Sequence, residues 1–203
     1  MSNKWTRSIF RIAGLAFLTA IIVVLQVVTT YFPTKPFAVT LALVPIIIGA
    51  AIYGPSAGAY LGGVFSIVVI AMCIFGVDIG GAMVWNANPI LCVLMCMLKG
   101  VMAGWVAGLL FSALKGTNAI LATVVAAIAS PIVNTGIFVM GMLLFFRPLL
   151  AEWAGGSDIL TYVIVGMTGV NFLIELLVNV VLSPIIVQII TAIRKQLPSN
   201  VQE

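Results

Sequence analysis

The sequence predicts an all-α integral membrane protein in which six transmembrane helices form a compact bundle. Of its 203 residues, 63% are hydrophobic and only 7% are charged, whereas about 25% of the residues in an ordinary soluble domain are charged. A helix needs about 20 mainly apolar residues to cross a bilayer, so the chain has room for roughly six crossings and no separate soluble domain. Its apolar stretches also lack the alternation that membrane β-strands require. We therefore expect residues 1–203 to form a single transmembrane domain.

The charged residues predict how the chain is oriented. If the chain crosses six times, one set of loops and ends holds most of the basic residues: Lys4, Arg7, Arg11, Lys115, Arg194 and Lys195. The opposite set holds two basic residues and three acids: Lys35, Arg147, Asp78, Glu152 and Asp158. Because cytoplasmic loops carry an excess of Lys and Arg, we expect both termini in the cytoplasm of a multi-pass cell-membrane protein.

Prolines and glycines delimit the first three helices. The first is expected over about residues 9–31 and ends before Pro33, which stops helix propagation. The second is expected over about 38–53. The tight turn 54–56, Gly-Pro-Ser, leads directly into the third helix, over about 57–75. These two helices should form a hairpin at the cytoplasmic side.

Three longer helices are expected in the second half of the chain. Pro89 suits the first turn of a fourth helix, and Asn118 can cap the fifth. The sixth is long enough to tilt or to bend at Pro184. The predicted helices cover about 89–114, 119–146 and 158–193, and the predicted outer segments are 76–88 and 147–157.

Residues that the sequence lacks exclude several classes of enzyme. It has no histidine, which removes zinc-protease motifs and Ser-His pairs, and no GxxxxGK phosphate loop. Glu175 is the one acid deep within a predicted helix, and a single acid is poor material for paired acid–base catalysis. We therefore expect no catalytic residue, no cofactor, no ATP hydrolysis by this chain and no nucleic-acid partner.

The three cysteines are expected to serve packing. Cys73, Cys92 and Cys96 lie in or beside apolar segments, where an unpaired cysteine behaves as a small hydrophobic residue. Cys92 and Cys96 are one helical turn apart, but no histidine is available to complete a metal site with them. The sequence therefore predicts no metal ligand.

Two ionisable residues lie near the middle of predicted helices, Lys99 in the fourth and Glu175 in the sixth. Placing such a residue in a membrane span costs about 2.5–3.5 kcal/mol on insertion scales, and the side chain usually faces a protein interior or a cavity. Two interpretations stay open. The residues form a structural ion pair with each other, or one or both face a bound solute.

Further polar residues predict a pocket between the fourth, fifth and sixth helices. Asn171, Glu175 and Asn179 recur every four residues and so share one helical face. Asn134 and Thr135 lie at a comparable depth on the fifth helix, and a few polar groups in a mostly apolar cavity are typical of a small-molecule site. The outer residues Trp85, Asn86 and Asn88 could cover it, although an interfacial tryptophan also serves as a membrane anchor.

Small residues at helical spacing predict close packing, because helices in lipid associate where their backbones can approach. Ala13, Ala16 and Ala20 lie on roughly one face of the first helix, and both internal packing and contact with another protein remain open for them. We expect the glycine stripes to pack inside the bundle: Gly58 and Gly62, and Gly100, Gly104 and Gly108.

Several motifs, in this order and with six spans in about 200 residues, resemble the substrate-binding S component of energy-coupling factor (ECF) transporters. The likeness covers nearly the whole chain. The motifs are AFLTA at 16–20, VPIIIGA at 44–50, YGPSAG at 53–58, NP at 88–89, LKG at 98–100 and SPIVNTG at 130–136.

The resemblance implies a bacterial membrane protein that captures a vitamin or related micronutrient from outside, surrounded by membrane lipid. Its partners would be a transmembrane coupling subunit and two cytoplasmic ATPase subunits. Ala16 and Ala20 match an Ala-x-x-x-Ala stripe that family members use to contact the coupling subunit. The family's pocket lies in the outer half, which matches the region around Asn86, Asn134 and Asn171.

Pantothenate is the predicted substrate, because its carboxylate could pair with Lys99 and its hydroxyls and amide with the asparagines. Folate, riboflavin, hydroxymethylpyrimidine and cobalamin are the alternatives within the family. A membrane scaffold without a solute site is the alternative from another class of protein.

Overall fold

The computed structural model describes the backbone of residues 2–31 and 40–196, and the side chains of residues 8–31, 40–169 and 172–193. Within these ranges the chain forms helices and no strand. The helices are α1 (Ser2–Tyr31), α2 (Leu43–Tyr53), α3 (Pro55–Ile74), α4 (Ile79–Ala87), α5 (Pro89–Leu114), α6 (Ala119–Phe145), α7 (Arg147–Ala154), α8 (Ile159–Thr161), the π-helical η1 (Tyr162–Gly169) and α9 (Val170–Gln196).

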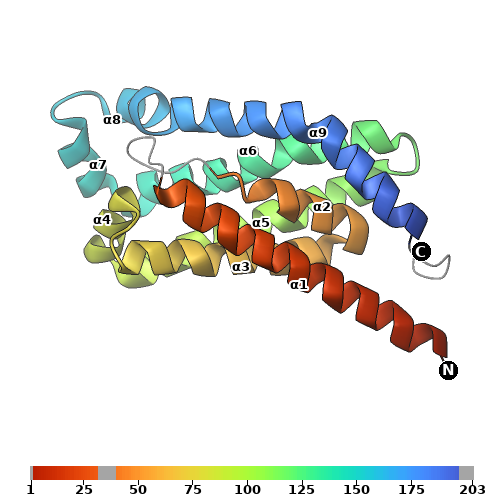
Figure 1. Cartoon of the computed structure of the whole chain (residues 1–203). Coiled ribbons are helices and arrows are strands. Elements are labelled where there is room, and N and C mark those ends of the chain that lie inside the picture. Colours follow the sequence, from red (N-terminus) through yellow and green to blue (C-terminus); the bar gives the residue numbers. More distant parts are fainter. Residues whose placement is uncertain (1, 32–39, 197–203) are drawn as a thin grey trace.

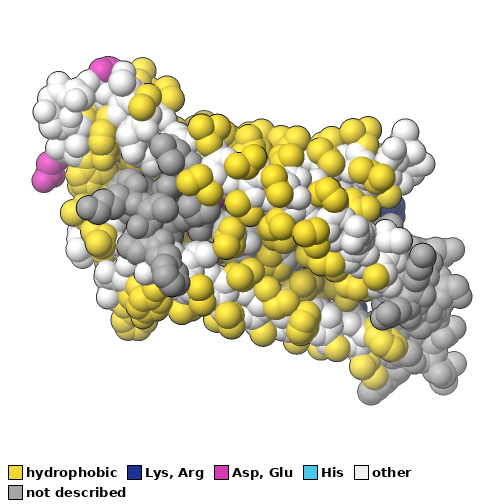
Figure 2. Space-filling model, turned by 45° about the horizontal axis from the view of Figure 1, so that its top comes forward, with side chains coloured by type: hydrophobic (Ala, Val, Ile, Leu, Met, Phe, Trp, Pro, Cys, Tyr) yellow, Lys and Arg dark blue, Asp and Glu magenta, His cyan; other side chains and the backbone are white. Residues whose placement is uncertain are grey.

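The predicted all-α membrane bundle is confirmed. Five helical stretches are long and apolar enough to cross a bilayer, and the sixth predicted crossing corresponds to the shorter apolar helix α2. Figure 1 shows the long helices packed along one another, with both termini at the same end of the molecule. Apolar side chains cover the middle of the surface seen in Figure 2, and acidic side chains gather at the end away from the termini.

The helix bounds agree with the predicted ones where a cap or proline defines them. Pro89 starts α5 and the Asn88 Oδ1 atom accepts a hydrogen bond from the Leu91 N–H at 3.1 Å. The Asn118 Oδ1 atom caps α6 in the same way, accepting from Ile120 N–H at 2.8 Å and Leu121 N–H at 3.1 Å. These side chains satisfy N–H groups that have no partner within the helix.

Four local features differ from the prediction, the first being that α1 begins at Ser2 instead of at about residue 9. The outer segments contain the short helices α4 and α7, each too short to span a membrane. Helix α2 begins at Leu43 instead of at residue 38, and residues 38 and 39 lie outside the described part of the chain. The sixth span opens with α8 and the π-helical turn η1 before α9 continues it. Helix α9 contains Pro184, the predicted position of a bend, and it changes direction in its C-terminal part (Figure 1).

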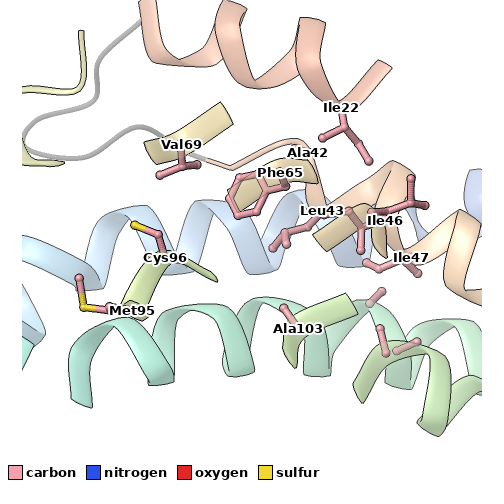
Figure 3. Packing of buried hydrophobic residues seen from close by; sticks show 14 of the residues in the cluster. Ile22, Ala42, Leu43, Ile46, Ile47, Phe65, Val69, Met95, Cys96 and Ala103 are labelled. Carbon is pink, nitrogen blue, oxygen red and sulfur yellow. The ribbon is translucent and has the colours of Figure 1, made fainter. Parts of the chain in front are cut away.

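Helix α2 lies at the centre of the core. Most of its residues are buried, and its isoleucines meet side chains from the surrounding helices. Figure 3 shows Ile46 and Ile47 among residues contributed by α1, α3 and α5. A helix enclosed in this way is apolar on all sides, which explains why its sequence, LVPIIIGAAIY, has almost no polar residue.

The closest contact between helices joins α3 to α5. A Cβ atom at Gly62 would collide with the Gly100 carbonyl oxygen, and one at Gly104 would collide with the Gly58 carbonyl oxygen. The Ser66 hydroxyl adds a bond across the same interface, since its Oγ lies 2.7 Å from the Cys96 carbonyl oxygen. The glycine stripes therefore pack inside the bundle, as predicted.

We expect Gly62→Ala to destabilise the protein by about 1–3 kcal/mol, because the added methyl group overpacks a backbone contact. Its neighbour Gly63 provides the matched control, because a Cβ atom there would lie 3.7 Å from Val101 Cγ2, an ordinary contact. Unfolding of the two variants in mixed micelles with increasing denaturing detergent measures the difference. Equal stability of the two variants would show that α3 and α5 can separate without cost.

Candidate functional site

A polar cavity lies inside the bundle, with a volume of about 70 Å³. Its walls come from α1, α3, α5, α6, η1 and α9 and from residues next to α2 and α4, so segments far apart in the sequence meet there. The lining residues are Gln26, Thr40, Phe65, Val69, Asp78, Lys99, Asn134, Thr135, Phe138, Met167, Thr168, Phe172 and Glu175.

Four predicted site residues line this cavity: Lys99, Asn134, Thr135 and Glu175. Asn179 is buried outside it, and its Nδ2 donates to the Glu175 carbonyl oxygen at 2.8 Å. The side chain of Asn171 lies outside the described residues.

The outer residues Trp85, Asn86 and Asn88 do not line the cavity. Trp85 is half-buried against the hydrophobic core, and Asn86 is exposed. Asn88 acts as the N-cap of α5. In this structure Trp85 contributes to packing and Asn88 caps a helix, while the Asn86 side chain lies on the surface.

Sequence reasoning missed Gln26, Thr40, Asp78 and Thr168 as lining residues. The signal for Gln26 was present, because a glutamine in the middle of an apolar span is costly unless it faces the protein interior. Asp78 gave no such signal, since it lies in a segment between spans. It reaches the cavity because α4 folds back against α3 and α5.

Glu175 joins two distant parts of the chain. Its Oε1 atom accepts a hydrogen bond from the Thr40 N–H at 2.8 Å, which ties α9 to the residues that lead into α2. The side chain is only 5% exposed, and its second oxygen, Oε2, has no partner. The carboxylate is thus held in place by one oxygen, while its other oxygen is buried without a partner.

Lys99 is not paired with Glu175: no ion pair joins these two residues, both of which the structure describes. The Lys99 Nζ atom lies over the Phe138 ring, 5.0 Å from its centroid. Such a cation–π contact holds an ammonium group in an apolar setting. Both side chains line the cavity, and their contact with a bound solute stays a prediction.

Four atoms of the cavity wall are buried without a hydrogen-bond partner: Gln26 Oε1, Asn134 Oδ1, Thr168 Oγ1 and Glu175 Oε2. Each such atom costs about 1–3 kcal/mol when it is left unpaired. Three of them are acceptors only, so the cavity is suited to a molecule that presents N–H or O–H donors.

Both signs of charge face the cavity. Asp78 and Glu175 are acidic and Lys99 is basic. Burial raises the pKa of Asp78 above its ordinary value, while the hydrogen bond from the Gly81 N–H works in the opposite direction. Asp78 lies between the membrane spans. A cation or a hydrogen-bond donor bound next to its carboxyl group would stabilise the ionised form.

An apolar crevice of about 650 Å³ adjoins the cavity, between α6 and the π-helical start of the sixth span. The two spaces share Thr135, Thr168 and Phe172. The remaining wall of the crevice is almost entirely aliphatic: Ile132, Gly136, Val139, Val163, Ile164, Val165, Gly169 and Leu173. Several of these side chains, among them Val165 and Leu173, are exposed, so the crevice opens on the outer surface of the bundle.

The small-residue face of α1 is open. Ala13, Ala16 and Ala20 are all exposed, and Phe17 between them is 67% exposed. Only 17% of the apolar stretch of α1 is buried in the bundle. The alanines therefore do not serve internal packing, and this face is available to lipid or to another protein.

Fold and cavity together define a multi-pass helical membrane protein with a polar cavity inside its bundle. A family model described as "ECF transporter, substrate-specific component" matches residues 10–187. Because the match covers most of the chain, the protein belongs to this family of substrate-binding transporter subunits, and the predicted resemblance is confirmed. Among curated proteins, none matches the chain significantly.

We expect Asn134→Leu to leave the unliganded protein at least as stable as the wild type, because the change removes a buried atom without a partner. Asn179→Leu is the matched control outside the cavity. It also removes an unpartnered oxygen, Asn179 Oδ1, but it breaks the Nδ2 bond to the Glu175 carbonyl oxygen as well, so this variant should be less stable than Asn134→Leu by about 1 kcal/mol. Thermal unfolding of both ligand-free variants in detergent measures the contrast. A large loss of stability in Asn134→Leu would indicate that Asn134 contributes to packing in the unliganded protein.

Proposed function

We propose that this S component captures a vitamin in the cavity and its adjoining crevice, and that the vitamin is pantothenate. The observation that carries the proposal is the set of unpartnered wall atoms beside Lys99. Groups buried at such cost are typical of sites whose partner is a ligand. The family match supports the role of substrate-binding subunit.

The chemistry of pantothenate matches the wall. Its carboxylate can pair with Lys99, and its two hydroxyls and amide N–H can donate to the acceptors on Gln26, Asn134 and Glu175. The polar cavity alone, at about 70 Å³, is much smaller than the roughly 300–1,000 Å³ of a typical ligand pocket. The gem-dimethyl part of the solute would therefore occupy the apolar crevice.

Hydroxymethylpyrimidine is the second candidate, because two acidic side chains, Asp78 and Glu175, face the cavity against the single Lys99. This balance favours a solute with an amine donor and no carboxylate. Folate, riboflavin and cobalamin complete the set of vitamins to be tested.

The first test is mass spectrometry of the small molecule that co-purifies with the protein, followed by calorimetric titration with the five vitamins. We expect pantothenate to bind, and Asn134→Leu to weaken its binding about tenfold, or 1.4 kcal/mol, because a ligand donor loses its acceptor. Asn179→Leu should bind as the wild type does. If another vitamin bound instead, that vitamin would be identified as the substrate. If none bound, the result would favour a scaffold without a solute site.

We further propose that the open face of α1 binds a transmembrane coupling subunit that works with two cytoplasmic ATPase subunits. The exposure of Ala13, Ala16 and Ala20 supports this, since small residues let a second helix approach closely. The chain has no phosphate loop of its own, so ATP hydrolysis would belong to the partners.

We expect the double change Ala16→Trp and Ala20→Trp to abolish co-purification with the coupling subunit while the affinity for the vitamin stays unchanged. Bulky side chains would separate the two helices without reaching the cavity. Ala113→Trp, at an exposed alanine of α5, is the control and should leave the complex intact. If the double variant still co-purified with the coupling subunit, the interface would have to lie on another surface of the protein.

A further inference from the structure

The fold brings together the three cysteines of the chain. Cys73 lies near the end of α3, and Cys92 and Cys96 lie in α5, yet the three Sγ atoms are all within 4.8 Å of one another. Each side chain is at most 3% exposed, and none forms a disulfide. Cys92 and Cys96 are neighbours because they are one helical turn apart. Cys73 lies close to them because of the packing of α3 against α5.

The α3–α5 contact sets this arrangement. The close approach at Gly62 and Gly100, together with the Ser66 bond to the Cys96 carbonyl oxygen, fixes the height of α3 along α5. Helix α4 leaves room beside the cluster because it carries Gly81, where a Cβ atom would collide with Cys73 Sγ. The Asp78 Oδ2 atom lies beside the same point, 2.8 Å from that Cβ position.

The spacing of the sulfur atoms suits a metal ion. With a Zn–S bond of about 2.3 Å, sulfur ligands in a tetrahedral site lie roughly 3.8 Å apart. The observed limit of 4.8 Å is about one ångström larger, a difference that small side-chain rotations can remove. Thiolates are soft ligands and favour soft cations over Mg²⁺ or Ca²⁺.

We propose that Cys73, Cys92 and Cys96 form a buried three-thiolate site for one soft divalent cation of the Zn²⁺ and Cd²⁺ class. On binding, each thiol releases its proton to solvent and forms one metal–sulfur bond, and no electron is transferred. Three thiolates and a divalent cation leave one negative charge. Lys99 lies one helical turn beyond Cys96 on α5, so a positive charge is carried on the same helix near the site.

Such a site would join α3 to α5 beside the substrate cavity. Val69, one turn before Cys73, and Lys99, one turn after Cys96, both line the cavity. A bound cation would therefore restrain two walls of the cavity while remaining separate from the solute. This places a structural metal next to the solute site, in a position that the sequence did not predict.

The test is a titration of the reduced full-length protein in detergent with Cd²⁺, followed by the ultraviolet thiolate-to-cadmium charge-transfer band. We expect one Cd²⁺ per chain, displaced by Zn²⁺, and at least tenfold weaker binding in each of Cys73→Ser, Cys92→Ser and Cys96→Ser. Met95→Leu, a buried neighbour on α5 that is not a ligand, should bind as the wild type does. Absence of the band, or equal binding by the serine variants, would overturn the proposal.

A second measurement needs no variant and so does not depend on how the variants fold. Saturating Zn²⁺ should protect all three cysteines of the wild-type protein from alkylation in mild denaturing detergent, as read by intact-protein mass spectrometry. Unchanged alkylation, or a mass two daltons lower that reveals a disulfide, would contradict the metal site. Vitamin binding is measured separately, so failure of this proposal leaves the proposed substrate untouched.

Discussion

The backbone contact between α3 and α5 sets the position of the cavity residues that these two helices carry. Glycines at 58, 62, 100 and 104 let the two helices approach until each carbonyl oxygen fills the space that a side chain would take. In lipid, where water does not drive helices together, such close packing is a main source of association. The contact carries Phe65 and Val69 of α3 and Lys99 of α5 to the same cavity.

The cavity itself opposes stability. Its wall contains buried polar atoms without partners, and a chain selected for stability alone would replace them with aliphatic residues. The apolar centre around α2 and the glycine contact compensate for this cost elsewhere in the bundle. Many binding proteins likewise combine a well-packed core with a site in which some polar atoms have no hydrogen-bond partner.

Much of the fold follows from the sequence because a bilayer leaves few choices. The bounds of α5 could be predicted to the residue, since Asn88 and Pro89 form a recognisable start. Lys99, Asn134, Thr135 and Glu175 could be assigned to a cavity because polar residues in apolar spans avoid lipid. Asn179 shows the limit of spacing arguments. It shares a helical face with Glu175, but it bonds to the backbone of its own helix.

Other features depended on packing that no local pattern reveals. Helices α4 and α7 are too short to be found by a search for spans. The position of Asp78 in the cavity wall and that of Cys73 beside α5 depend on how α4 and α3 dock.

The hydrogen bond between Glu175 and Thr40 joins the last span to the residues that lead into the central helix α2. One carboxylate oxygen accepts the Thr40 N–H just before the central helix, and the other is buried without a partner in a residue that lines the cavity. A solute bonded to Glu175 would contact a carboxylate that also accepts a hydrogen bond from the backbone of Thr40. A change at Glu175 would therefore remove both a polar group of the cavity wall and the bond that ties α9 to the residues before α2.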